Sequence, residues 1–569
     1  MTSAAVAVLE REMLECYLAR RPLTAWQLGL GVPGGLPPVS TAQVDALAGR
    51  YRALLDRVRA AGGPRTPGAP DDAAEPDRLA CRLMAQICAD EIDSLQLHVD
   101  RFTVSPLPEA GLSSALLTFL PYASLGSADD VTGYLDTCAQ LPRVLADYAA
   151  ELAVGRGFAQ FPVSALVDRA LAQVRTYLAA PIADDPFALP LRSYGASPTA
   201  LERLSRLILT AVRPAFARLA DEFEVPVRDR ARGDDHPGIC WVTGGSTAYR
   251  VLIREHTTLA LDPADLHRLG TDLIAQLEIE AVAITARLGW VGDFAAVRDR
   301  LRADPALRYR DAQQMVQVAQ AAMDRAGSAV PEWITDLPRA GCEVRPMLDT
   351  ETAHGVLGHY ETAPLDRSRP ATYWLNTADP RSRPVFEAEA LAFHEAIPGH
   401  HIEIATSQES SGGSEFRRIV QVLPYTEGWA LYCERLADEI GLYSSDVDRL
   451  GMVSFDLWRS CRLVVDTGLH EFGWSRDRAV DYLWEHSMLS RSNVVNEVDR
   501  YIAHPGSALG YMVGRLAIQQ LRNAAVTDSS DRVQLRAFHD RLLRRGPLTL
   551  GLLSEQAGVP LTFAAPPTP

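Results

Sequence analysis

Apolar residues recur at the spacing of an α-helix along most of the first 335 residues. The pattern predicts helices over roughly 2–20, 41–61, 76–98, 129–153, 163–180, 197–222, 262–289 and 311–326. Asp262-Pro263 marks one start clearly, because a capping side chain precedes a proline that fits the first helical turn. The Pro- and Gly-rich stretch 62–76 predicts a surface loop. We expect this N-terminal helical region to form the walls of a cleft.

Between about 340 and 377 the spacing changes to that of short strands. The segments GCEVRPML, HGVLGHY and ATYWLNT predict a small antiparallel β segment, and helical spacing returns after it. Asn376 ends the last of these strands. It is either a turn residue or, if an extended substrate lies along the strand, a substrate-binding residue. The chain is therefore predicted to be mainly α, with an N-terminal region over 1–335 and a second region over 336–569 that could also form one unit with it.

The chain has 569 residues, a formal net charge of -16 at pH 7 and a pI of about 5.3. This charge, without any basic block, disfavours nucleic acid as a partner. All 56 basic residues are arginines, which excludes a lysine Schiff base or a lysine general base. The eight cysteines are scattered and suit a reducing compartment, and no apolar run is long enough to span a membrane. We expect a cytoplasmic protein with no membrane partner, and its oligomeric state is left open.

The densest chemistry lies in the segment HEAIPGHH, from His394 to His401. A His-Glu pair followed by a further histidine is typical of zinc hydrolases, in which the histidines bind the metal and the glutamate accepts a proton from water. Pro398 stands where the second histidine usually lies, and proline disfavours a regular helix there. We expect a bulge or kink, and the spacing alone leaves His400 and His401 both open as the second ligand. Helix-terminal histidines beside a Pro-Gly turn are the simpler alternative.

The segments on either side of the motif are predicted to be helices. Before it, apolar residues at helical spacing indicate an amphipathic helix that leads into the site: Phe386, Ala390, Phe393 and Ile397. After it, PYTEGWALYCERLADEIG places Glu427 and Glu434 on one helical face. The neighbours of Glu427 are apolar, so we interpret it as the third metal ligand rather than as a solvated surface residue.

Two further clusters follow. Arg462, Asp466 and His470 recur every four residues and share a helical face. A buried row of this kind can orient metal ligands or stabilise an oxyanion, and a helix-surface ion pair is the alternative. Arg500 and Tyr511 flank the next turn, where either side chain, if it faces the metal, would stabilise a tetrahedral intermediate.

These segments resemble the bacterial domain-of-unknown-function family number 885, whose members look like zinc peptidases of the gluzincin kind. The matching blocks are YRVLIREHTTLALDP, NTADPRSRPVFEAEALAFHEAIPGHHIE, PYTEGWALYCE, RSCRLVVDTGLH and EVDRYIAHPGSALGYMVG, in this order between residues 249 and 514. The family pattern HExxPGH implies His400 as the second ligand, and the resemblance also implies Glu427 as the third. The family often has glutamine where this chain has Glu403, which would alter the charge of the cleft.

We therefore expect a large helical, metallopeptidase-like fold that acts as a zinc-dependent hydrolase on a peptide or small amide substrate. The proposed Zn²⁺ ligands are His394, His400 and Glu427; the catalytic residues are Glu395, Tyr511 and His470; and the substrate-binding residues are Asn376, Arg462 and Arg500. Three alternatives stay open. One is a biosynthetic amidohydrolase or other tailoring metalloenzyme acting on a small natural product. Another is an iron or manganese oxidative enzyme, although the chain lacks its paired Glu-x-x-His motifs. The last is a metal-free binding scaffold.

Overall fold

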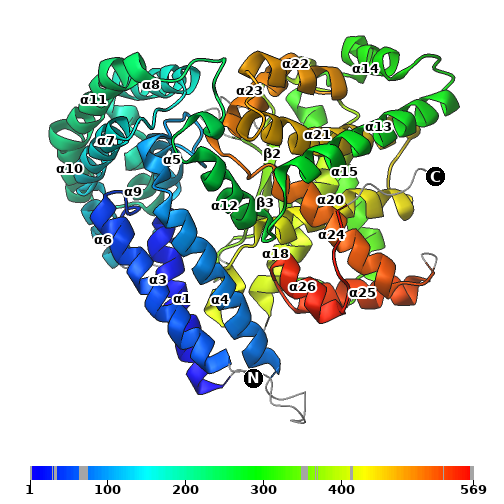
Figure 1. The fold of residues 1–569 in the computed structure, drawn as a ribbon, viewed down its shortest axis with the longest axis horizontal. Coiled ribbons are helices and arrows are strands. Elements are labelled where there is room, and N and C mark those ends of the chain that lie inside the picture. The colour runs from blue at the N-terminus through cyan, green and yellow to red at the C-terminus, as the bar shows by residue number, and fades with distance from the viewer. Residues whose placement is uncertain are drawn as a thin grey trace. The chain divides into compact units, whose positions relative to one another are not determined.

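The computed structural model describes residues 3–28, 30, 35–62, 75–347, 357–365, 367, 369–410, 414–528 and 531–563. The chain forms two compact units. The first comprises Met1–Val251, Gly473–Arg476 and Ile502–His504, and the second comprises Leu252–Phe472, Asp477–Tyr501 and Pro505–Pro569. Both are built mainly of helices, which confirms the mainly α prediction (Figure 1).

In the first unit, α1, α3 and α4 lie side by side (Figure 1), and the remaining helices pack around a core that includes Trp26, Tyr134 and Phe216. Its helices are α1 (Ala4–Arg20), α2 (Pro22–Gln27), α3 (Thr41–Gly62), α4 (Glu75–Gln96), η1 (Val99–Arg101), α5 (Leu112–Phe119), η2 (Leu120–Tyr122), α6 (Ala128–Cys138), α7 (Leu141–Gly157), α8 (Ser164–Ala179), η3 (Ile182–Asp184), η4 (Pro186–Ala188), α9 (Leu189–Tyr194), α10 (Pro198–Leu207), η5 (Ile208–Val212), α11 (Arg213–Glu222), η6 (Phe223–Val227), η7 (Arg228–Arg230) and η8 (Ile239–Trp241); α12 (Gly245–Thr257) continues into the second unit.

Two of the predicted helices are divided in the structure. The helix expected over 129–153 is the pair α6 and α7, because Pro142, in the first turn of α7, has no N–H with which to continue α6. The helix expected over 197–222 is α10 and α11, joined by the π-helical turn η5. The other helices predicted before residue 335 are present, with bounds that differ by a few residues.

The second unit is organised around the 25-residue helix α21 (Asp446–His470), which is buried from Leu450 to His470. The other elements assigned wholly or partly to this unit are α13 (Pro263–Arg287), α14 (Phe294–Ala303), η9 (Pro305–Leu307), α15 (Ala312–Ala329), η10 (Val330–Glu332), β1 (Cys342–Pro346), β2 (Gly358–Glu361), β3 (Ala371–Leu375), η11 (Pro380–Ser382), α17 (Ala388–Glu395), α18 (His400–Glu409), α19 (Glu415–Ile419), α20 (Leu423–Glu439), α22 (Arg476–His486), α23 (Arg491–Ala503), α24 (Leu509–Ala525), α25 (Arg532–Arg544) and α26 (Leu550–Ala557).

The region boundary expected at residue 335 lies inside this second unit. Helices from both sides of that boundary pack together. The ring Nδ1 of His267 in α13 lies 2.8 Å from Thr467 Oγ1 in α21, and Arg325 in α15 donates to Glu389 in α17 at 2.6 Å. The helices that hold the candidate site are therefore supported by α13 and α15 from the preceding part of the chain.

The three strands form one sheet in the order β1-β3-β2. Pairing of β2 with β3 is antiparallel, but β1 pairs with β3 in parallel, so the prediction of an antiparallel segment is wrong for one of the two pairs. A parallel pair needs a crossover connection. Strand β2, which lies between β1 and β3 in the sequence, pairs with the other side of β3.

Candidate metal centre

An interruption between two helices creates the site. Helix α17 ends at Glu395 and α18 begins at His400, as expected from Pro398-Gly399. A Cβ atom on Gly399 would lie 1.9 Å from the carbonyl oxygen of His394, so only glycine permits this close approach. Trp429 of α20 donates its indole N–H to the Pro398 carbonyl at 3.0 Å and holds the connection in place. Helix α17 itself is buried on every side, so the expectation of an amphipathic helix is wrong.

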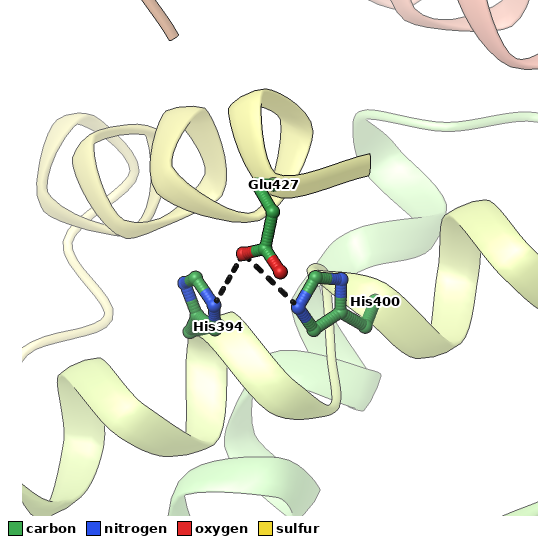
Figure 2. A group of neighbouring side chains, drawn as sticks. All are labelled: His394, His400 and Glu427. Carbon is green, nitrogen blue, oxygen red and sulfur yellow. Dashed lines mark ion pairs between the residues drawn. The ribbon is translucent and has the colours of Figure 1, made fainter. Parts of the chain in front are cut away.

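Three side chains meet at this interruption. His394 comes from the end of α17, His400 from the start of α18 and Glu427 from α20, and they point toward one another (Figure 2). Glu427 Oε2 lies 3.5 Å from His394 Nε2 and 3.7 Å from His400 Nε2. One ligand atom from each residue lies within 4.8 Å of the others. The fold thus brings together the three residues predicted from the sequence as metal ligands.

The donor set fits a zinc ion. Two ligand atoms about 2.0–2.2 Å from a tetrahedral zinc stand roughly 3.4 Å apart, close to the distances between Glu427 and the two imidazoles. Glu427 Oε2 is buried and has no hydrogen-bond partner among the described residues. A buried carboxylate oxygen facing two imidazole nitrogens is costly unless a cation or proton lies between them. The two-histidine, one-glutamate set leaves room for a further ligand, as catalytic zinc sites require.

Glu434 contacts the second ring nitrogen of His394, the one that does not face Glu427. Its Oε1 lies 2.8 Å from His394 Nδ1, and its side chain is fully buried. A carboxylate at Nδ1 keeps the proton on that nitrogen and leaves the lone pair of Nε2 for a metal. The sequence placed Glu434 on the same helical face as Glu427, but only the contact shows its role.

The pKa values of the three donors indicate that a positive charge held between them stabilises the site. Burial lowers the pKa of His394, but the nearby carboxylates of Glu427 and Glu434 outweigh it and raise the pKa to about 9. Burial raises the pKa of Glu427, but His394 and His400 outweigh it and lower the pKa to about 2. The pKa of His400 is lowered by burial to about 4, which leaves its ring neutral and able to bind a metal.

Glu395 and Tyr511 stand near these donors. Burial raises the pKa of Glu395 to about 7, with the charge of Glu427 acting in the same direction. Burial and Glu427 also raise the pKa of Tyr511, so its hydroxyl keeps its proton. Arg500 donates to the Tyr511 hydroxyl at 3.0 Å, which fixes the oxygen and leaves the O–H free to donate elsewhere. Arg500 therefore positions Tyr511.

The row predicted on α21 is buried, but its members serve separate partners. Arg462 donates to Glu497 at 3.0 Å, and Asp466 accepts from the backbone N–H of Gly506 at 3.1 Å. His470 Nε2 lies 2.9 Å from the carbonyl oxygen of Tyr501. These contacts tie α23 and the following turn to α21 and exclude the surface ion-pair alternative. The catalytic role proposed for His470, stabilisation of an oxyanion, stays a prediction.

The geometry favours the turn role of Asn376. Its side chain is fully buried and its Oδ1 accepts from the backbone N–H of Ala378 at 3.1 Å. Strand β3 is central and paired on both sides along Thr372–Leu375, so an extended substrate finds no free edge there. Substrate binding by Asn376 stays a prediction without support from these contacts.

Glu403 is buried in α18. Burial raises its pKa to about 8, which leaves it uncharged at neutral pH. A neutral glutamic acid offers the same donor and acceptor pair as glutamine. This raised pKa disfavours the expectation that Glu403 alters the charge of the site at neutral pH.

These observations define a mainly helical protein with a candidate metal centre of two histidines and one glutamate. The chain belongs to the family described as bacterial protein of unknown function (DUF885), whose sequence model matches residues 22–556. No curated protein matches it. Among the described residues, none of the helices combines the length and apolar character needed to cross a bilayer.

Two solved structures share the fold. One, from Colwellia psychrerythraea, is 23% identical in sequence, with a TM-score of 0.87 over 97% of this chain and 98% of that one. The other, from Shewanella oneidensis, is 15% identical, with a TM-score of 0.74 over 97% of this chain and 100% of that one. Both are named as a "putative lipoprotein", a description that belongs to those proteins. At this level of identity the comparison shows the fold alone.

Proposed function

We propose that this protein is a zinc-dependent hydrolase of peptide or amide bonds. The convergence of His394 Nε2, His400 Nε2 and Glu427 Oε2 carries the proposal, with Glu434 behind the first histidine and Glu395 next to it in the chain. When bound, zinc acts as a Lewis acid and makes water a stronger acid at neutral pH. Paired Glu-x-x-His motifs, which a di-iron carboxylate centre requires, are lacking in the sequence.

The residues of this chain supply the rest of the chemistry. Glu395 accepts a proton from the attacking water and passes it to the leaving nitrogen. The Tyr511 hydroxyl, held by Arg500, donates to the substrate oxygen as negative charge develops on it. Glu434 keeps His394 in the tautomer that presents Nε2.

The test combines metal analysis with turnover of a peptide library by the full chain. We expect about one equivalent of zinc in the purified protein. Glu395→Gln keeps size and hydrogen bonding but cannot accept a proton, so kcat should fall by about 10²–10⁴-fold with zinc unchanged. Glu403→Gln is the matched control, because it makes the same change at a different buried glutamate whose pKa of about 8 keeps it mostly protonated at pH 7, and it should keep wild-type turnover. A zinc-replete Glu395→Gln protein within tenfold of wild type would refute this role.

A further inference from the structure

Two buried arginines on α21 have guanidinium nitrogens without a hydrogen-bond partner among the described residues. Arg459 is 3% exposed and Arg462 is 1% exposed. The unpartnered atoms are Nε and Nη1 of Arg459 and Nη1 of Arg462. Taking a guanidinium out of water costs several kcal/mol unless an acceptor replaces the lost hydration. An acceptor from outside the described residues would therefore satisfy these N–H groups.

The carboxylates nearest to these arginines are shared with other groups. Glu497 serves two cations at once, because its carboxylate lies 3.0 Å from Arg462 and 3.6 Å from Arg500. The ion pair of Arg459 with Glu434 Oε1 is long, at 3.9 Å, and that oxygen is already bonded to His394. Glu427 also interacts electrostatically with both Arg459 and Arg462, but it is a proposed zinc ligand. An anion, not a cation, would complete this cluster.

Arg459 lies near the metal centre, and its guanidinium packs on two aromatic rings. Its guanidinium carbon lies 4.4 Å from the ring centre of Phe455 and 4.2 Å from that of Trp458. The charge of Arg459 acts on the pKa of Glu395 and of His400, which places it within electrostatic reach of both. Rings packed on a guanidinium fix its plane and exclude water, which strengthens a charge-assisted hydrogen bond.

We propose that Arg459, with Arg462 adding to the positive field, binds a carboxylate of the substrate next to the metal centre. The substrate is then a peptide or N-acyl amino acid whose free α-carboxylate lies beside the bond that is cut. This inference rests on the proposed function. A guanidinium matches the planar geometry of a carboxylate, and the C-terminal carboxylate is the one anion that every unmodified peptide carries beside its last amide bond.

The binding test uses the zinc-loaded full chain and two probes of the same shape, 3-phenylpropanoate and 3-phenylpropanamide, measured by calorimetry. A charge-assisted contact should make the acid bind about 10- to 100-fold more tightly than the amide. Arg459→Gln should remove this difference with zinc content unchanged, and Arg459→Lys should keep part of it. The same titrations on metal-stripped protein show whether the acid binds the arginine or the zinc.

Three results would overturn the proposal. Equal binding of acid and amide to the wild type would show that no carboxylate site exists, and this comparison needs no variant. Retention of the preference by Arg459→Gln would place the carboxylate on the zinc alone. Loss of zinc in Arg459→Gln would show that Arg459 acts through Glu434 to position His394.

Cleavage assays then show whether the bound carboxylate is the α-carboxylate of the C-terminus or that of a side chain. A peptide with a free C-terminus should be cut, and its C-terminal amide should be cut about 10- to 100-fold more slowly. Preference for an amidated peptide with a glutamate beside the bond would overturn the α-carboxylate assignment. If zinc-replete protein cuts no peptide but still binds the acid through Arg459, the proposed hydrolase function fails and the carboxylate site stands.

Discussion

His400 and His401 are neighbours in the chain, but their ring nitrogens have different partners. His401 Nε2 lies 3.0 Å from the Ala340 carbonyl oxygen, and its Nδ1 lies 3.2 Å from the Tyr360 hydroxyl. Both nitrogens are thus engaged in contacts that tie α18 to the sheet. His400 instead directs Nε2 toward Glu427 at 3.7 Å. The hydrogen-bond partners therefore favour His400 as the ligand, as the family pattern implied.

This difference predicts opposite results for two single substitutions. His400→Ala should abolish stoichiometric zinc binding, because it removes one of three ligands. His401→Ala should keep zinc and lose stability by about 1–3 kcal/mol through its unsatisfied partners. Metal analysis and chemical denaturation of the two variants measure both effects. Loss of zinc in His401→Ala alone would reverse the ligand assignment.

His539 predicts a pH-dependent stability away from the metal ligands. Its Nδ1 lies 2.9 Å from the Trp333 carbonyl oxygen, and its Nε2 lies 2.8 Å from the Tyr432 hydroxyl. Burial lowers its pKa from 6.5 to about 4; the Trp333 contact and Asp540 oppose this shift, and Arg522 adds to it. The unfolded chain therefore binds a proton that the folded protein excludes between pH 6.5 and 4.

Stability should accordingly fall as the pH is lowered through that window, by up to about 3 kcal/mol from this residue. Denaturation at pH 7 and pH 4.5 measures the change in the free energy of unfolding. His539→Asn cannot be protonated at this position. Its unfolding in this pH window should therefore take up about one proton fewer than that of the wild type, and its stability should depend less on pH. Equal slopes for the two proteins would contradict the assignment.

At the scale of elements, the crossing of α20 and α24 sets the geometry of the site. Gly428 in α20 and Gly514 in α24 face one another, and a Cβ atom on Gly514 would lie 1.8 Å from the Pro424 carbonyl oxygen. The close approach brings Tyr511, one turn before Gly514, to the helix that carries Glu427. Larger residues at the crossing would separate the two backbones.

Gly514→Ala should therefore destabilise the protein by about 2 kcal/mol or more, because backbone must shift to admit the methyl group. It should also lower turnover more than zinc content, since Tyr511 moves with α24 while the ligands lie on α17, α18 and α20. Gly551→Ala is the control: no atom lies within 4 Å of the added Cβ, and alanine favours the helix. Unchanged stability in Gly514→Ala would contradict the close crossing.

At the scale of the whole molecule, all three donors belong to one compact unit, whereas the other unit contributes none of them. The ligands come from three helices that are held together by contacts across the chain, such as Trp429 to Pro398. Metal binding should thus stabilise the folded arrangement of the second unit. A ligand that binds only the folded state raises stability in proportion to its affinity.

Zinc at about 1,000 times its dissociation constant should raise the free energy of unfolding by about 4 kcal/mol. Chelation of the wild type should lower its melting temperature, and His394→Ala should melt like the chelated wild type whether or not zinc is added. His401→Ala serves as control and should respond to zinc. Calorimetric scans with and without chelator give the result, and an equal response by His394→Ala would place the metal elsewhere.

The sequence alone predicted most helices, because apolar spacing and proline positions act within one segment. It also predicted His394, Glu395 and Glu427 as one chemical group, since these residue types recur at the spacing that zinc chemistry needs. The tertiary structure decided what depends on distant partners. Glu434 is 40 residues from His394, and Ala340, which engages His401, is 61 residues from it.

The same reason explains the parallel pairing of β1 and the two Arg459 nitrogens that have no hydrogen-bond partner among the described residues. Strand order depends on how the chain crosses between strands, which periodicity does not encode. A buried arginine and a surface arginine look alike in a sequence, because α21 is read as a helix in either case. Only the packed unit shows that Arg459 packs on two aromatic rings and that two of its nitrogens have no hydrogen-bond partner among the described residues. Burial depends on the surroundings of a residue and not on its own segment.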